Sequence, residues 1–316
     1  MNEKCRYCGS DKVVFIAECR EPVANEEHER GQPSDTGFVP GQLLRCPECH
    51  LGMRCPAPSD GELKNINNFS DLEKYNYGCT GHNAQQMARK LLIKQFSPDA
   101  DISVLDIGCF KGDFLASLPG KWKRFGIEPN ESMGEIFAEG NIKVIGSHLE
   151  DNYSLWKEYF DVITMFDVFE HLSNPGAGIR NALELLKAGG VLILCTGNMD
   201  ACSWRLLKGQ YYYLDDMRHI SFASVRFFKR FFREEGIKHY SIRKISHQPS
   251  GTFERIHDSV VAFYFFCRFN RGFWRIPHRV IQSLPGFRRL RHSKNAPYLY
   301  ALKDHLFVEI LKTELA

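Results

Sequence analysis

The 316-residue sequence lacks several features that would point to particular classes of protein. No stretch approaches the roughly 20 consecutive apolar residues that a membrane-spanning helix needs. The first residues, MNEKCRYCGS, are polar and lack the apolar core of a signal peptide, so we expect a cytoplasmic protein. The net charge of only +3 gives no general case for nucleic acid as a partner. The odd count of eleven cysteines argues against a disulfide framework in that setting.

Four of the cysteines form two closely spaced pairs near the N-terminus. Cys5 and Cys8 make one Cys-x-x-Cys turn, and Cys46 and Cys49 make a second. Two such turns supply the four thiolates of a tetrahedral zinc shell. Because four protein ligands leave no open coordination position, we expect structural Zn²⁺ in a module spanning residues 1–60. A set of unrelated reduced thiols is the alternative.

Residues 61–100 are expected to form a linker and a helical cap. The stretch HNAQQMARKLLIKQF (82–96) has apolar residues at helical spacing, and a proline follows it. The polar segment before this helix carries Tyr75 and Tyr77, which we name as candidate acceptor contacts. Packing of the linker on the next domain explains these two tyrosines equally well.

From residue 102 onward the sequence alternates between strand and helix patterns. Strands are expected at 102–108, 124–128, 142–146, 160–167 and 190–196. A helix over 175–187 has Asn174 as its N-cap and Gly189 just past its end. Such alternation predicts a mostly parallel sheet with helices on both faces. Ligands of such sheets bind beyond the carboxyl ends of the strands.

The first of these strands runs into a glycine turn in VLDIGCFKGDFL (104–115). A dinucleotide fingerprint would need glycine at positions 110 and 113, which are Phe110 and Asp113 in this chain. The Gly-Lys-Ser/Thr ending of a Walker loop is also absent from the stretch. What remains is Asp106-x-Gly108-x-x-x-Gly112. Its glycines let a ligand approach closely, and its carboxylate repels phosphate but attracts an ammonium group.

A second acidic residue, Glu128, closes the next strand 20 residues after Gly108. A carboxylate in this place can accept hydrogen bonds from both hydroxyls of a ribose. A ribose at one end and a cationic amino acid at the other describe S-adenosylmethionine.

The chain resembles class I S-adenosylmethionine-dependent methyltransferases in four successive motifs: VLDIGCFKGDFL, FGIEPN, FDVITMFDVFEHLSNP and LKAGGVLILCTGN. The resemblance implies a methyltransferase domain over 101–316 with a Rossmann-like α/β fold. Its seven-stranded sheet would have six parallel strands and an antiparallel last strand, preceded by a helical insert. The fold of the family also implies a set of cofactor-binding residues: Asp106, Gly108, Cys109, Phe110, Gly112, Glu128, Leu149, Glu150, Phe166 and Asp167.

Methyl transfer to a hydroxyl or a C–H acid needs a base, and two histidines follow predicted strands. His171 stands beside Glu170 in DVFEHLSNP, and His219 lies in GQYYYLDDMRHISFAS (209–224). A histidine near neutral pKa suits proton removal, so we name His219, His171 and Glu170 as catalytic candidates. Alternatively, His171 fixes its own loop by hydrogen bonding, and His219 braces the next helix. Candidate acceptor contacts in the same stretch are Tyr211, Tyr212 and Tyr213.

The last two strands are expected at 236–246 and 304–312, separated by an insert at about 250–303. Between Asp258 and Asp304 the sequence has no acidic residue but nine lysines or arginines, interleaved with aromatics. Such a segment (259–303) suits a membrane surface, a phosphate-bearing acceptor or RNA. A helical lid with solvated arginines is the structural alternative.

A four-cysteine module before a class I domain resembles the zinc-containing sugar methyltransferases of bacterial polysaccharide and antibiotic pathways. We therefore expect methyl transfer to a sugar, a glycan precursor or a related small molecule, with a histidine as base. Whether oxygen, carbon or nitrogen is methylated stays open. The alternatives are an RNA methyltransferase with a zinc ribbon and a non-catalytic scaffold that binds zinc and cofactor. We expect cytoplasmic localisation, with peripheral contact at the inner membrane face as an option.

Overall fold

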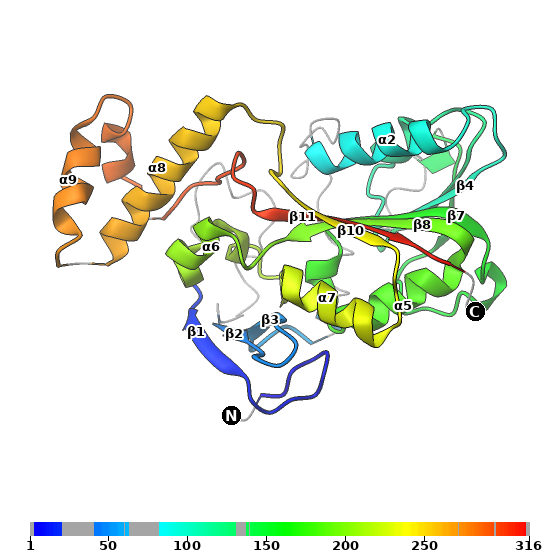
Figure 1. Cartoon of the computed structure of the whole chain (residues 1–316), viewed down its shortest axis with the longest axis horizontal. Coiled ribbons are helices and arrows are strands. Elements are labelled where there is room, and N and C mark those ends of the chain that lie inside the picture. Colours follow the sequence, from blue (N-terminus) through cyan, green and yellow to red (C-terminus); the bar gives the residue numbers. More distant parts are fainter. Residues whose placement is uncertain are drawn as a thin grey trace.

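The computed structural model describes residues 3–20, 41–59, 61–62, 82–130, 137–138, 140–270, 272–293 and 295–313. A seven-stranded sheet forms the centre of the molecule, with strand order β10-β11-β8-β7-β4-β5-β6 (Figure 1). Its strands are β4 (Ser103–Ile107), β5 (Lys123–Ile127), β6 (Ile142–Gly146), β7 (Phe160–Phe166), β8 (Leu186–Gly197), β10 (Tyr240–Ile245) and β11 (His305–Leu311). Only β11 runs antiparallel to its neighbours in this sheet. The predicted fold class is confirmed.

Helices cover both faces of the sheet, as the alternating pattern predicted. Helix α2 (Asn83–Gln95) lies on one face, and α5 (Pro175–Leu185) and α7 (Val225–Glu234) lie on the other (Figure 1). Successive strand residues point to opposite faces, so Val104 joins the α2 side of the core and Leu105 joins the α5 side. The central strands are buried on both faces, which explains their continuous apolar sequences.

The helix starts follow local capping rules. The Asn174 side chain accepts a hydrogen bond from the Ala177 N–H at 3.0 Å, and a proline opens the first turn of α5. The Ser224 hydroxyl accepts from the Phe227 N–H at 3.0 Å at the start of α7. Shorter helices complete the domain: α3 (Asp113–Ala116), α6 (Cys202–Leu207), η3 (Ser154–Trp156), η4 (Phe169–His171), η5 (Lys208–Gln210) and η6 (Tyr212–Leu214).

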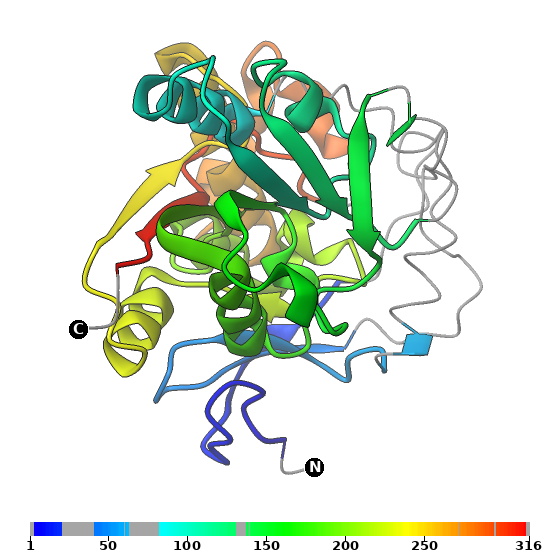
Figure 2. The ribbon, with the colours of Figure 1, turned by 90° about the vertical axis from the view of Figure 1, so that its right-hand side faces the viewer.

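The N-terminal segment forms a small antiparallel sheet of β1 (Val14–Glu18), β2 (Gln42–Arg45) and β3 (Gly52–Cys55). Strand β9 (Ser221–Phe222) of the larger domain joins this sheet by pairing with β3. The Arg54 guanidinium, fully buried, donates to the carbonyl oxygens of Leu214 and His219. The N-terminal segment therefore holds the loop at 214–219 of the larger domain. It lies along the side of that domain (Figure 2).

The insert before the last strand is helical. It contains α8 (Thr252–Phe269), α9 (Arg275–Ser283) and the short η7 (Arg288–Arg291). The inner face of α8 packs against α6 through Tyr264, Phe265 and Trp204, while α9 lies at the far end of the arm (Figure 1). Within the described ranges, no helix is both long and apolar enough to cross a membrane.

Candidate functional site

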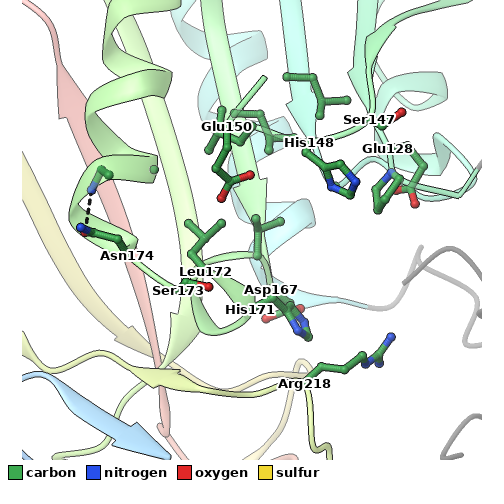
Figure 3. Close-up of a pocket in the computed structure, with 18 of the residues that line it drawn as sticks. Glu128, Ser147, His148, Glu150, Asp167, His171, Leu172, Ser173, Asn174 and Arg218 are labelled. Atoms are coloured by element: carbon green, nitrogen blue, oxygen red, sulfur yellow. Dashed lines mark hydrogen bonds between the residues drawn. The ribbon is translucent and has the colours of Figure 1, made fainter. Parts of the chain in front are cut away.

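A cavity of about 460 Å³ opens at the carboxyl ends of β4, β5 and β7, where parallel sheets of this kind bind ligands. Figure 3 shows its polar groups in two sets. Glu128, Ser147 and His148 lie at one end, and Asp167, His171 and Arg218 gather at the other. Glu128 therefore marks one end of the cavity, and His171 and Arg218 mark the other.

The glycine turn after β4 forms one wall of this cavity. Gly108 has φ +70°, and a Cβ added there would lie 2.6 Å from Cγ2 of Val168. Gly112 has φ +75° and would clash with Ile142. Both positions thus require glycine, as the sequence indicated. Phe110 also has positive φ, at +46°, a backbone conformation that non-glycine residues rarely adopt.

Glu128 connects the end of β5 to the glycine turn. Its two carboxylate oxygens accept hydrogen bonds from the Phe110 N–H at 2.8 Å and from the Asn130 N–H at 3.1 Å. Burial raises the pKa of Glu128, although the two backbone N–H groups oppose that shift. Each oxygen keeps a further lone pair. The carboxylate, which lines the cavity, can thus receive two hydroxyls of a ribose.

The other predicted cofactor residues divide into cavity-lining and supporting groups. Leu149, Glu150 and Asp167 line the cavity. Asp106 is buried and accepts a hydrogen bond from the Thr164 hydroxyl at 2.6 Å, and burial raises its pKa to about 7. Asp106 does not line the described cavity, and neither do Cys109 and Phe166, which pack in the core on the α2 side of the sheet. Direct contact of these three residues with a cofactor stays a prediction.

Of the two candidate base histidines, His171 lines the cavity and His219 lies behind it. His171 lines the cavity, and no described group hydrogen-bonds to its buried Nδ1. Burial lowers the pKa of His171 to about 3, so its ring is neutral at physiological pH but is a weaker base than the near-neutral histidine that the sequence predicted. The ring centroid of His219 lies 4.9 Å behind it. Nδ1 of His219 lies 2.7 Å from the Tyr213 carbonyl oxygen, a contact that requires Nδ1–H and leaves Nε2 as the basic nitrogen.

Glu170 and the three tyrosines belong to a buried polar network behind the histidines. Glu170 accepts hydrogen bonds from the hydroxyls of Thr196, at 2.9 Å, and Tyr213. Burial raises the pKa of Glu170 to about 7. The hydroxyls of Tyr211 and Tyr212 both donate to Asp304 at the start of β11. These tyrosines do not line the described cavity, so their contact with an acceptor stays a prediction.

Tyr75 and Tyr77 lie outside the described residues. Sequence reasoning missed Arg218 and His148, which line the cavity, and also His82 and His247, which meet Asp167 beside it. The three histidines share a positional signal, since His148 and His247 follow strands and His82 directly precedes a helix, whereas Arg218 lies in the loop before β9 and has no such signal.

The four predicted cysteine ligands converge. Sγ of Cys5 lies 3.4 Å from that of Cys49, and Sγ of Cys8 lies 3.6 Å from that of Cys46. All four sulfurs lie within 4.8 Å of one another. A tetrahedral shell with Zn–S bonds of about 2.3 Å has sulfurs about 3.8 Å apart, so the four thiols fit one zinc ion. Matching backbone turns, Gly9 N–H to Cys5 O and His50 N–H to Cys46 O, hold the two pairs.

A family model described as a methyltransferase domain matches residues 80–241. The ubiquinone biosynthesis O-methyltransferase of Ruegeria sp. is 32% identical over 127 residues, covering 36% of this chain and 49% of that protein. The mitochondrial ubiquinone biosynthesis O-methyltransferase of Candida albicans is 28% identical over 130 residues, covering 38% of each chain. The chain thus spans less than half of the length of these relatives.

Two solved structures are similar at the level of the fold alone. The plantazolicin methyltransferase BpumL, solved with SAH, has a TM-score of 0.48 and 18% identity, covering 80% of this chain and 98% of that one. A SAM-dependent methyltransferase from Archaeoglobus fulgidus has a TM-score of 0.44 and 18% identity, covering 72% and 94%.

Proposed function

This chain belongs to the class I S-adenosylmethionine-dependent methyltransferases, and we propose that it methylates a hydroxyl of a sugar or glycan precursor. The observation that carries the proposal is that Glu128 lies at one end of the cavity and His171 at the other. The first end suits a ribose, and the second suits the proton of an acceptor hydroxyl. Oxygen is favoured as the methylated atom because the curated relatives described above are O-methyltransferases.

Bound S-adenosylmethionine supplies a methyl group that is already activated on a sulfonium. The protein then has to align the acceptor and remove one proton. We assign the contact with the hydroxyl to His171, whose neutral ring lines the cavity. His171 would accept the hydroxyl proton when the acceptor oxygen takes the methyl group, although its lowered pKa makes it a weaker base than an ordinary histidine. His219 stands behind it, with Nε2 3.9 Å from Asp216, where a carboxylate stabilises an added positive charge.

The test is the transfer of labelled methyl groups to separated fractions of a cell extract. Nucleotide sugars, lipid-linked glycans, hydroxylated quinone precursors and RNA are incubated with the protein and labelled cofactor. Label in a sugar fraction supports the proposal, whereas label in the quinone or RNA fraction alone replaces the acceptor. His171→Ala should abolish labelling and His239→Ala, on an exposed residue, should preserve it. No label in any fraction would favour a non-catalytic scaffold.

We also propose that the four-cysteine site holds structural Zn²⁺, because its sulfur separations match a tetrahedral shell. No position is left open for a substrate when all four thiolates bind the ion. The ion would link two backbone turns that are far apart in sequence and would stabilise a small sheet with little core of its own.

We also propose that α9 and the residues that flank it (273–291) contact a membrane surface. Phe273, Ile276, Val280 and Leu284 follow one another at spacings of 3, 4 and 4 residues and are 78%, 67%, 58% and 43% exposed. Ile276 and Val280 lie one turn apart on α9 and form an apolar stripe, which Phe273 and Leu284 flank just outside the ends of the helix. Arginines at 275, 279, 288, 289 and 291 lie in the same segment, which has no acidic residue. This combination suits an anionic bilayer surface, with the stripe in the interface and arginines at the headgroups. A lipid-linked glycan precursor would meet the enzyme there.

Vesicle sedimentation tests this surface. We expect binding to vesicles of anionic lipid, weaker binding to zwitterionic vesicles, and loss of binding in an Ile276→Asp, Val280→Asp double variant. Leu155→Asp is the matched control, because Leu155 is 92% exposed and lies on η3, outside the arm. Equal sedimentation of the double variant and the control would contradict membrane contact through α9.

A further inference from the structure

Three side chains of metal-binding type meet beside the cavity: His82, Asp167 and His247. One ligand atom from each lies within 4.8 Å of the other two. His82 is the N-cap residue of α2, Asp167 follows β7, and His247 follows β10. Three separate segments thus bring two imidazoles and one carboxylate to the edge of the sheet where the cofactor cavity opens.

The carboxylate in this cluster is incompletely satisfied. Oδ2 of Asp167 lies 3.7 Å from Nε2 of His247, beyond hydrogen-bond distance. Oδ1 of Asp167 is buried and has no hydrogen-bond partner among the described residues. The backbone of Asp167 also has φ +54°, a conformation that non-glycine residues rarely adopt. The Asp167 side chain is 36% exposed overall, and its unpaired Oδ1 leaves a position that a bound cation can fill.

Surrounding contacts fix both histidines. Nδ1 of His247 is hydrogen-bonded to the Tyr298 hydroxyl, which leaves Nε2 as the nitrogen facing Asp167. Asn83 binds the same loop twice, through its backbone N–H to the His247 carbonyl and through its side chain to the Ser246 carbonyl, both at 3.0 Å. Because Asn83 directly follows His82, these bonds also set the separation of the two imidazoles. Their ring centroids lie 4.4 Å apart. Such support is typical of histidines that hold a metal.

We propose that His82, Asp167 and His247 bind one divalent transition-metal ion, distinct from the ion at the four cysteines. Two imidazole nitrogens and one carboxylate suit Zn²⁺, Mn²⁺, Fe²⁺ or Co²⁺, and disfavour Mg²⁺ and Ca²⁺, which prefer oxygen. Three protein ligands leave coordination positions open. Because Asp167 also lines the cavity, an acceptor hydroxyl can reach one of those positions. Binding of the acceptor hydroxyl by the metal would be a catalytic role, and this role rests on the proposed methyl transfer. Metal binding by the three side chains does not depend on that proposal.

Metal content of the full chain tests the site without using turnover. After loading with Co²⁺ and removal of excess metal, we expect one equivalent at the cysteines and a second equivalent at this cluster. Cobalt bound to thiolates gives intense charge-transfer absorption, while cobalt bound to nitrogen and oxygen gives only weak visible bands. The two sites are thereby counted separately in one sample.

His82→Ala and His247→Gln should each remove the second equivalent and the weak bands, and leave the thiolate bands unchanged. His239→Ala, on an exposed histidine next to β10, should keep both equivalents. Thermal unfolding of each variant checks that the fold is retained. A wild-type chain with cobalt only at its cysteines, or equal metal content in all four proteins, would overturn the site. Loss of the second metal equivalent with unchanged methyl transfer would support the metal site and show that the metal has no role in catalysis. Failure of the metal-site proposal and failure of the methyl-transfer proposal therefore give different results.

Discussion

Replacing Glu128 by glutamine tests the assignment of the nucleoside end of the cavity. The carboxylate lines the cavity and accepts from Phe110 N–H at 2.8 Å and from Asn130 N–H at 3.1 Å, which leaves further lone pairs that can accept from ligand hydroxyls. Glutamine keeps one oxygen but puts an NH₂ group where the second acceptor was. One backbone bond is lost in the free protein, and one ribose bond is lost on binding.

The expected effect on binding follows from that single lost ribose bond. A hydrogen bond to a charged acceptor contributes about 1.5–3 kcal/mol. The dissociation constant for S-adenosylmethionine should therefore rise about 10- to 150-fold, at 1.4 kcal/mol per factor of ten. Isothermal calorimetry at neutral pH measures this change. Glu184→Gln is the matched control, since Glu184 is exposed on α5, away from the cavity.

The same variant gives a pH signature. Burial raises the pKa of Glu128, so the wild-type carboxylate gains its proton at a higher pH than an exposed glutamate does. Cofactor affinity should fall as pH decreases through that raised pKa, because a protonated carboxyl loses its charge and one acceptor. Glu128→Gln should not show this component. An unchanged dissociation constant in a variant with native thermal stability would refute the ribose assignment.

Three further predictions concern the glycine turn, the buried network and the cysteines. Gly108→Ala should lower the midpoint of thermal unfolding and weaken cofactor binding, because φ is +70° and the added Cβ meets Val168 at 2.6 Å; native values for both would contradict the strain. Glu170 should contribute a loss of stability as pH rises from about 4.5 to about 7, because burial raises its pKa to about 7 and the folded state holds the proton more tightly; the lowered pKa of His171 contributes in the opposite direction. Denaturant titrations should show that Glu170→Gln removes part of this slope, and an identical slope would exclude Glu170 as its source. Cys5→Ser should release zinc and lower the unfolding midpoint, whereas Cys202→Ser, on an exposed thiol, should do neither; equal zinc content would contradict the site.

The parts of the fold that the sequence predicted are those with a local physical cause. Strands β4 and β7 are buried on both faces, and their apolar runs predicted them to within about two residues of the observed ends. Gly108 and Gly112 were named because glycines let a ligand approach closely, and the structure adds a local cause, a left-handed backbone at a crowded position. The capping of α5 by Asn174 was equally local.

The parts that sequence reasoning missed depend on contacts between distant segments. His82 and His247 have no shared motif, and only the placement of α2 beside the end of β10 brings them to Asp167. The three adjacent tyrosines were predicted to contact an acceptor, because they cannot all pack on one face of a helix or strand. A 3₁₀ turn and the buried Asp304, which directly precedes β11, place the hydroxyls of Tyr211 and Tyr212 on one acceptor instead.

The small N-terminal sheet also constrains the acceptor end of the cavity. Its β3 strand pairs with β9, and Arg54 donates to carbonyls on both sides of Arg218, at Asp216 and His219. These bonds hold the loop that carries Arg218 into the cavity, while the glycine turn and Glu128 receive their support from within the larger domain. Loss of zinc should therefore disturb the acceptor end more than the cofactor end. We expect Cys5→Ser to reduce the rate of methyl transfer while the dissociation constant for S-adenosylmethionine stays within about threefold, which is under 0.7 kcal/mol. Cofactor affinity that fell in proportion to the rate would mean that the small sheet supports the whole domain.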